Sequence, residues 1–348
     1  MAISDEFADA TIRHQVYLQR YKSGVIKDIL ALVKDVEGKI ISDLINQQLQ
    51  DMPRRQLNKL FRKLRDDISA GYKPVIALLQ KRVVELAKYE KSWQMDQFKE
   101  LVPIEIDFLA PSDEQIIAAV ISKPFEGELL KDWYRGLPQG QFNRVKKAIN
   151  EGYVEGQTTA QIVRAIRGTR TQTGIIQQSR RGAETAVRTS LSHSANTARS
   201  LVYQKNSKLI KSVEWVSTLD GRTTAICRAY DGKTFPTDSG PRPPAHPSCR
   251  STTIPVIKSL RELGIDADEV LNASTRSSMN GQVSDELNYD RWLRTQKNTF
   301  QNEVLGRKKA KLFRAGLKMD RFIDRKGNEL TLDQLKQRDS AAWARAGL

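Results

Sequence analysis

Residues Asp220–Thr252 read D-G-R-T-T-A-I-C-R-A-Y-D-G-K-T-F-P-T-D-S-G-P-R-P-P-A-H-P-S-C-R-S-T. This stretch holds both cysteines of the 348-residue chain, Cys227 and Cys249, and one of its three histidines, His246. Five prolines and two glycines lie between the cysteines, and a helix cannot run through so many. We therefore predict strand, turn, strand and a proline-rich loop, which leads into a further strand at residues 251–256.

Three possible metal ligands lie in this stretch. Two residues separate His246 from Cys249, and eighteen separate Cys227 from His246, which is enough for a hairpin to fold back. Zinc prefers four sulfur or nitrogen ligands, and a carboxylate can be the fourth. Asp220 and Asp231 are the candidates, and we expect Asp220 to be the fourth ligand or a group that orients a ligand.

We therefore predict a structural zinc ion in this loop, although two other interpretations of the same residues stay open. Two small buried cysteines beside a loop histidine need no metal, because cysteine packs as a small apolar residue. A disulfide would require an oxidising compartment.

The same residues carry a family resemblance. D-G-R-T followed by a cysteine, then Y-D-G-K-T-F-P and P-P-A-H-P-S-C-R-S, resemble the C-terminal module of Mu F-like head morphogenesis proteins of tailed phages. Downstream, Y-D-R-W-L-R-T-Q, Q-N-E-V-L-G-R-K-K-A-K-L-F-R-A-G and L-T-L-D-Q-L are similar to the C-terminal extension of many members. The resemblance covers roughly residues 157–335 and leaves the first 110 residues without a counterpart.

The resemblance implies a role in the phage particle. Members of this family are minor capsid components that associate with the portal and act in head assembly, and some travel with or influence DNA at ejection. It therefore implies a virion protein that is made in the host cytoplasm, lies inside the head and has the portal or the major capsid protein as partner.

The net charge of +16 is unevenly distributed. Residues 135–205 hold 12 basic and 3 acidic side chains, and residues 291–348 hold 15 and 6, whereas the rest of the chain is nearly neutral. Basic blocks on a neutral scaffold favour contact with polyanions, most simply the phosphates of packaged double-stranded DNA. The densest cluster, for which an acidic surface of a neighbouring head protein is the rival partner, is Arg307, Lys308, Lys309, Lys311 and Arg314.

Apolar residues at three- and four-residue steps predict that the chain is mostly helical, with a small antiparallel sheet, so that its class is α+β. We divide it into a helical partner-docking region (1–105), a module with the predicted zinc loop (112–256) and a basic helical extension (257–348). The predicted helices span residues 10–50, 54–69, from 74 to about 100, 139–151, 158–168 and 179–205; residues 212–218 form a strand, and residues 272–285 form a loop.

The helix predicted at 179–205 has an unusual face of small residues, which allows close packing against the sheet. Arg188 and Asn196 on this helix either are buried polar partners of the cysteine-bearing hairpin or are simply exposed. His193 is more typical of a core or surface histidine whose hydrogen bonds are satisfied than of a metal ligand.

No catalytic pattern is evident in the sequence. It has neither a phosphate-binding G-x-x-x-x-G-K-[ST] loop nor a G-x-S-x-G elbow. Two enzyme alternatives are a cysteine nucleophile paired with a histidine base and a metal-dependent nuclease. The metals of nucleases prefer oxygen ligands, however, whereas two thiolates favour a structural zinc site. We therefore expect a non-enzymatic protein, with a zinc-containing, non-sequence-specific DNA-binding protein as the second candidate.

Two cysteines argue against a disulfide scaffold and favour a reducing cytoplasm. No apolar run approaches the ~20 residues of a membrane span, and the N-terminus lacks the pattern of a signal peptide.

Overall fold

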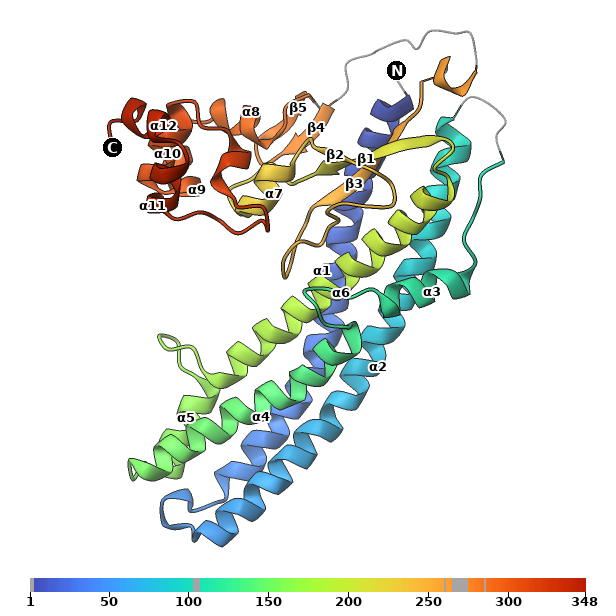
Figure 1. Cartoon of the computed structure of the whole chain (residues 1–348). Helices are drawn as coiled ribbons and strands as arrows, with labels where there is room; N and C mark the ends of the chain where they lie inside the picture. The colour runs from blue at the N-terminus through green and yellow to red at the C-terminus, as the bar shows by residue number, and fades with distance from the viewer. Residues whose placement is uncertain (1–2, 103–106, 260, 265–274, 285) are drawn as a thin grey trace. The chain divides into compact units, whose positions relative to one another are not determined.

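Apolar stripes at helical spacing fill the first hundred residues, and in the computed structural model they form two long helices, α1 (Ile3–Ile45) and α2 (Arg54–Leu101) (Figure 1). A single 3-10 turn, η1 (Leu49–Asp51), lies between them. The structure describes residues 3–102, 107–259, 261–264, 275–284 and 286–348. These residues are mostly helical, with a small antiparallel sheet, which confirms the predicted α+β class.

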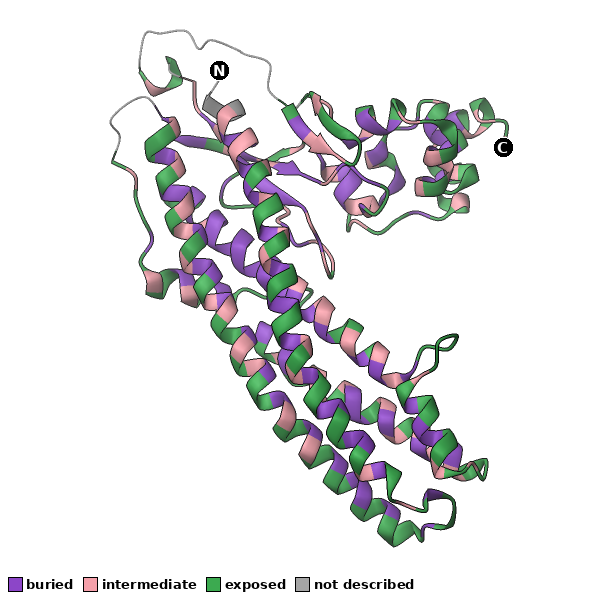
Figure 2. Ribbon diagram, turned by 180° about the vertical axis from the view of Figure 1, so that it is seen from behind, coloured by how far each residue is buried: buried purple, intermediate pink, exposed green. Residues whose placement is uncertain are grey.

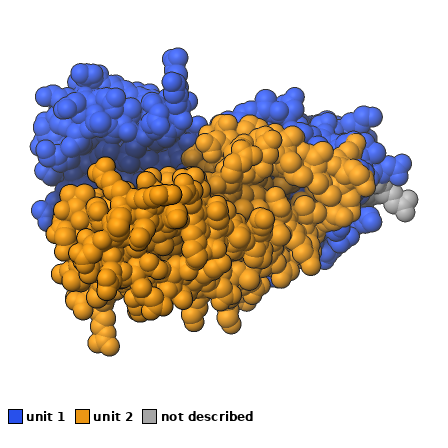
Figure 3. All heavy atoms as spheres, turned by 90° about the horizontal axis from the view of Figure 1, so that it is seen from below, with its two compact units in different colours: residues 1–17, 90–112, 196–348 blue, residues 18–89, 113–195 orange. Residues whose placement is uncertain are grey.

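The chain divides into two compact units (Figure 3). Unit 1 holds residues 1–17, 90–112 and 196–348, and unit 2 holds residues 18–89 and 113–195. The helices α1, α2 and α6 (Ile175–Lys205) each contribute residues to both units. The first hundred residues therefore supply part of the core of each unit.

In unit 2, α1 and α2 form an antiparallel hairpin, because Lys39 pairs with Asp67 at 2.7 Å and Lys63 pairs with Asp43. Buried residues follow the inner faces of both helices, and exposed residues follow the outer faces (Figure 2). The buried stripe includes Val33, Leu64 and Leu79, each completely shielded from solvent. Apolar burial along this stripe is therefore the main force that holds the hairpin.

The prediction of a helix break at Pro74 was wrong, because this proline lies inside α2, which is one helix of 48 residues. A proline inside a helix removes one hydrogen bond and costs about 3 kcal/mol. The residues around it, Tyr72 and Val75, are fully buried and continue the stripe on both sides of the proline. Burial of an uninterrupted apolar face offsets the local cost.

Four more helices contribute to unit 2: α3 (Asp113–Ser122), α4 (Leu130–Val154), α5 (Thr159–Arg167) and the first part of α6. Arg65 of α2 stacks over the ring of Phe142 of α4, with 4.9 Å between guanidinium carbon and ring centroid. The start of α4 was predicted after Pro138, but the helix begins eight residues before this proline. The predicted cap at Thr158 is confirmed, since its side chain accepts a hydrogen bond from the backbone N–H of Gln161.

Unit 1 contains the predicted sheet, which is three-stranded and antiparallel with the order β2-β1-β3. The strands are β1 (Ile210–Val216), β2 (Thr234–Phe235) and β3 (Thr252–Ile257). Val213 pairs with Phe235 on one side and with Pro255 on the other. Buried side chains from the last turns of α6, the start of α1 and the end of α2 pack with Val213, and they include Phe7, Phe98, Val202 and Tyr203.

Two local predictions were wrong, one for the segment between β1 and β2 and one for a segment after β3. A short helix, α7 (Ala225–Tyr230), stands where we expected a strand, because the run A-I-C-R-A-Y precedes all the prolines of the stretch. The polar segment predicted as a loop forms a hairpin, β4 (Thr275–Ser278) and β5 (Gly281–Ser284), and the rest of that segment lies mostly outside the described residues. The buried Arg276 anchors the hairpin through an ion pair with Asp231 at 3.0 Å.

The last sixty residues fold around Trp292 and Phe313, which are both fully buried. No helix among the described residues combines the length and the apolar character that crossing a membrane needs. The elements of this part, with a short 3-10 turn η2 (Arg261–Leu263) upstream, are α8 (Tyr289–Arg294), α9 (Asn298–Leu305), α10 (Arg307–Arg314), η3 (Met319–Phe322), α11 (Leu332–Arg338) and α12 (Ser340–Arg345).

Candidate functional site

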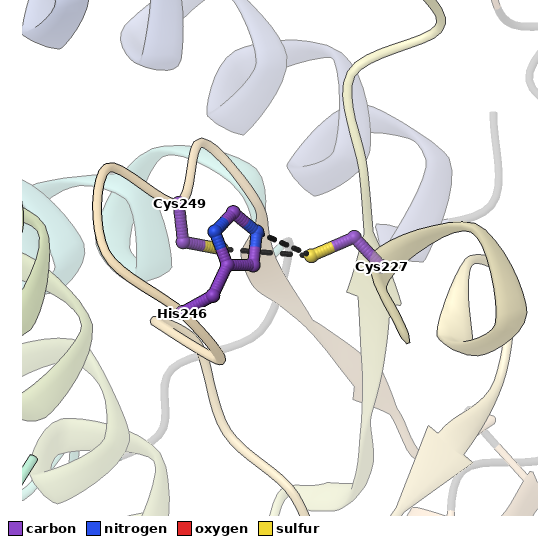
Figure 4. Close-up of side chains that lie close together, drawn as sticks. All are labelled: Cys227, His246 and Cys249. Atoms are coloured by element: carbon purple, nitrogen blue, oxygen red, sulfur yellow. Dashed lines mark hydrogen bonds between the residues drawn. The ribbon is translucent and has the colours of Figure 1, made fainter. Parts of the chain in front are cut away.

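The structure brings together the three residues that the sequence singled out, Cys227, His246 and Cys249, which we call the Cys–His–Cys group (Figure 4). Cys227 lies on α7, whereas His246 and Cys249 lie on the proline-rich loop before β3. The sulfur of Cys227 lies 3.3 Å from Nε2 of His246 and 3.6 Å from the sulfur of Cys249. All three ligand atoms lie within 4.8 Å of one another.

These separations fit a tetrahedral metal site. Bond lengths of about 2.3 Å to sulfur and about 2.0 Å to nitrogen place two sulfurs about 3.8 Å apart, and sulfur and nitrogen about 3.5 Å apart. The two observed separations, 3.6 and 3.3 Å, are within a few tenths of an ångström of those values. Neither cysteine forms a disulfide, and each is only 1% exposed, so the two sulfurs can bind a metal away from bulk water.

His246 is oriented by its own loop. Its Nδ1 lies 2.9 Å from the carbonyl oxygen of Pro247 and donates to it in the tautomer that leaves Nε2 as an acceptor. Nε2 is the atom that faces Cys227. Metal-binding histidines commonly donate the second ring N–H in this way, which fixes both the tautomer and the ring plane.

The two thiols are not equivalent. The pKa of Cys249 is well below its usual value, because the thiol of Cys227 donates a hydrogen bond to it and His246 adds a favourable interaction. The pKa of Cys227 is well above its usual value, because of the same hydrogen bond and because of burial. Without a metal, Cys249 is therefore the thiol that deprotonates more readily of the two.

The structure does not bring Asp220 into this group. Its carboxylate accepts hydrogen bonds from both terminal nitrogens of Arg250, at 2.6 and 2.8 Å, and from the backbone N–H of Arg222. Burial alone would raise the pKa of Asp220, but the hydrogen bonds from Arg250 hold it below its ordinary value. Asp220 fixes Arg250, the residue next to Cys249 in the chain. This contact suits a group that orients a metal ligand better than a residue that binds the metal directly.

Asp231, the other carboxylate candidate, is bound elsewhere. It is 5% exposed and accepts from the backbone N–H groups of Ser217 and Tyr289, at 2.5 and 2.7 Å, and from Arg276. Arg276 also donates to the carbonyl oxygen of Ser217, so a single buried carboxylate joins β1, α7, β4 and α8. Sequence reasoning missed Arg276, because the segment that contains it has a loop-like composition.

Ser217 also connects the Cys–His–Cys group to the sheet. Its hydroxyl lies 2.9 Å from the carbonyl oxygen of Cys227 and 3.0 Å from the hydroxyl of Ser251. The indole N–H of Trp215 donates to the same hydroxyl at 2.9 Å, and Trp215 packs with both cysteines. The two chain segments that carry the sulfurs are thus held at a fixed separation.

A second buried polar cluster lies in unit 1. Arg199 of α6 is completely buried and donates to Glu90 of α2 at 2.8 Å and to the hydroxyl of Thr252 on β3. The other oxygen of Glu90 lies 2.5 Å from Nε2 of His14. The hydroxyl of Thr252 donates to Asn196, so Asn196 is a buried partner of this strand. These contacts join α1, α2, α6 and β3 within the unit.

The two remaining polar residues singled out on α6 do not take part. Arg188 pairs with Glu184 on its own helix at 2.9 Å and is half-buried. His193 is buried, its Nε2 lies 3.1 Å from the carbonyl oxygen of Val120, and burial lowers its pKa to about 4. His193 is therefore a satisfied core histidine, as the sequence suggested.

The five basic residues predicted to contact DNA lie on α10 and do not share one environment. Lys309 pairs with Glu329 at 2.7 Å, and Arg314 donates to the side chains of Gln301 and Asn302. The other three, Arg307, Lys308 and Lys311, are exposed and make no ion pair with a described residue. The cluster is therefore cationic even after its internal pairing.

Residues 143–254 match the model of the family described as Phage Mu protein F like protein. The matched segment is about a third of the chain and contains the whole Cys–His–Cys group, α6, β1, α7 and β2. No curated protein and no solved structure matches the chain significantly.

Proposed function

We propose that the protein is a minor head protein of a tailed phage, because its residues 143–254 match the model described as Phage Mu protein F like protein. The single observation that carries the proposal is that the family match contains the Cys–His–Cys group, whose two cysteines are buried. The protein lies inside the head near the portal, and it assists head assembly, DNA packaging and ejection. These finer roles are implied by the family resemblance.

The proposal includes one structural zinc ion, held by Cys227, His246 and Cys249. Two thiolates and an imidazole are a donor set that zinc prefers, and burial of both sulfurs suits a structural site better than a catalytic one. Asp220 contributes indirectly, by holding Arg250, the residue next to Cys249. Elemental analysis of freshly purified protein should find about one zinc per chain, and a value near zero would contradict this part.

We propose that the α1–α2 hairpin docks the protein onto the portal or the major capsid protein. Its outer face carries exposed apolar side chains, including Val16 and Ile45 at 46% and 54% exposure. Because residues of both helices pack into each unit, the test uses surface substitutions and not a deletion. Val16→Glu or Ile45→Glu should lower incorporation into heads while the purified protein stays folded; normal incorporation of both variants would contradict docking by this face.

The exposed cations of α10 bind packaged DNA through its phosphates, without base readout. Arg307, Lys308 and Lys311 supply three charges that have no acidic partner among the described residues. Replacing all five basic residues of the cluster by alanine should weaken binding of random-sequence duplex and make its salt dependence shallower. Equal affinity of the variant and the wild type would favour an acidic protein surface as partner.

The protein acts, in this proposal, as a structural component and not as an enzyme. The second candidate, a zinc-containing DNA-binding protein that acts outside the particle, is favoured by the same basic residues. Mass spectrometry of full and emptied particles separates the two. A minor head protein should be present at low copy number in purified full particles, and loss on emptying would mean that it leaves with the DNA; absence from full particles would overturn the proposal.

A further inference from the structure

A groove in unit 2 lies beside the loop of residues 168–174, which connects α5 to α6. Two adjoining hollows make it up, and they share Gln177 and Arg180 in their walls. We define the basic groove by this loop together with Lys34, Arg167, Arg180 and Arg181. Four of its cations belong to the basic block of residues 135–205, and Lys34 comes from α1. The groove shares no residue with α10 or with the Cys–His–Cys group.

The groove has a strong excess of positive charge. With Arg170 at the loop, five cations line it, against one acidic residue, Glu37. Glu37 is 3% exposed and is fully engaged with Arg180, whose Nε donates to both carboxylate oxygens at 2.9 and 3.0 Å. The four other cations are exposed and form no ion pair with any residue that the structure describes. An anion that entered the groove would therefore meet four unneutralised charges.

The loop itself is held in one shape. Gly168 has a φ of 80°, and a Cβ at Gly174 would lie 2.2 Å from the backbone nitrogen of Gly168, so both positions require glycine. The backbone N–H of Thr169 donates to the carbonyl of Gln172 at 2.9 Å, and the N–H of Gln172 donates to the Thr169 hydroxyl at 3.0 Å. The tip of this closed turn presents Arg170 to solvent.

The lining chemistry identifies the class of ligand. Guanidinium groups match phosphate oxygens in a bidentate geometry, and the threonine hydroxyls of the loop can donate to the same oxygens. None of the residues that line the two hollows is aromatic. Single-stranded nucleic acid needs aromatic platforms for its bases, and the centre of a protein interface is enriched in aromatic side chains. These features favour a duplex backbone over both alternatives.

We propose that the basic groove binds the sugar–phosphate backbone of duplex DNA, with Arg170 reaching out from the loop and Arg167 and Arg181 contacting neighbouring phosphates. The sequence of the bases plays no part. This site adds to the DNA contact proposed for α10, and it does not depend on the place of the protein in the phage head.

The test uses the full-length chain and a random-sequence duplex at several salt concentrations. The groove variant carries Arg167→Gln, Arg170→Gln and Arg181→Gln, and the control carries Lys59→Gln, Arg62→Gln and Lys73→Gln. The control removes the same charge from exposed positions of α2 in the same unit. Loss of three phosphate contacts should make the slope of log affinity against log salt shallower by about 2.7 and lower affinity more than ~10-fold at low salt.

The control should keep the wild-type slope within about one unit, because the charges that it removes do not line the groove. Equal losses in both triple variants would mean that only net charge matters, and an unchanged groove variant would exclude the groove; either result overturns the proposal. Binding of polyglutamate, but not of duplex, through the groove arginines would also overturn it and indicate an acidic protein partner.

A variant that should bind duplex more tightly than the wild type tests the proposal without relying on a loss of binding that misfolding could also cause. Glu37→Gln removes the one acidic group and frees Arg180, so it should bind duplex several-fold more tightly than the wild type, with unchanged helical content. Weaker or equal binding by this folded variant would contradict the proposal. If wild type fails to bind duplex at all, both DNA sites fail, whereas membership in the phage head is judged independently by mass spectrometry of particles.

Discussion

The α1–α2 hairpin of unit 2 and the Cys–His–Cys region of unit 1 are stabilised in different ways. The hairpin buries a long run of aliphatic side chains, and its ion pairs lie at the surface with the lysines about half exposed. Around the Cys–His–Cys group, a loop rich in proline is held by sulfurs, a histidine and buried carboxylate–arginine pairs. A segment with little apolar surface therefore depends on a few polar contacts, each of which carries more of the stability.

The largest effect should come from removing a ligand of the proposed zinc ion. Cys249→Ser should abolish metal binding and destabilise unit 1 by more than about 4 kcal/mol, because metal binding in such loops is coupled to folding. Zinc content and urea denaturation measure the two effects. Ser239→Ala, at an exposed position in the same loop, is the control and should change neither; retention of full zinc by Cys249→Ser would exclude Cys249 as a ligand.

Breaking the buried ion pair of Asp231 should rank next. Arg276→Ala leaves a carboxylate buried without its charged partner, which typically costs about 3–5 kcal/mol. Urea denaturation of this variant and of Arg291→Ala, an exposed arginine on α8, measures the difference. Adding Asp231→Asn to Arg276→Ala should recover part of the loss, and the absence of any recovery would mean that packing, and not charge, dominates at this site.

In the hairpin, the largest single effect should come from an apolar residue. Leu64→Ala removes a completely buried side chain, and we expect a loss of about 3 kcal/mol from reduced burial and the cavity left behind. Lys59→Ala, on the exposed face of the same helix, should change stability by less than about 0.5 kcal/mol. Similar losses in both variants would contradict the idea that the apolar stripe carries the hairpin.

The smallest effect should come from the surface charges of the hairpin. Lys63 is 54% exposed and pairs with Asp43 and Asp67, so Lys63→Ala should cost only about 0.5 kcal/mol after solvent screening. Hydrogen bonds from Lys39 and Lys63 lower the pKa of Asp67 from 3.8 to about 2. This stabilisation is therefore complete above pH 4 and disappears as the pH falls towards 2. Denaturation of both proteins at pH 7 and pH 2 should show the difference shrinking, and a constant difference would contradict it.

Much of the fold could be predicted because local patterns agree with the tertiary packing. The apolar steps of α1 and of the small-residue helix α6 gave the correct element type, and Thr158 gave the correct start of α5. Two of the wrong predictions share one cause. At Pro74 and in β4–β5, the energy that decides the local structure comes from residues distant in sequence, such as the apolar partners of Val75 and the carboxylate that binds Arg276.

The same distinction applies to the candidate site. Its three ligand-type residues could be identified because cysteine and histidine are rare in this chain and two of them are close in sequence. The assignment of Asp220 depended on Arg250, thirty residues away, and a sequence pattern does not reveal which cation a carboxylate will pair with. The cluster of Arg199, Glu90 and His14 was missed for the same reason, since these residues come from three separate helices.

The sequence by itself determined the helical and sheet-forming character of the chain, the identity of the three sulfur and nitrogen donors and the presence of two basic blocks. These properties depend on side-chain type and on spacing along a few turns of chain, which sequence records directly. Only the tertiary structure decided which charges remain unpaired. Glu37 neutralises Arg180 from 143 positions away and leaves Arg167, Arg170 and Arg181 exposed around a rigid loop, because pairing requires contact within a few ångströms and only the folded chain brings such distant residues together.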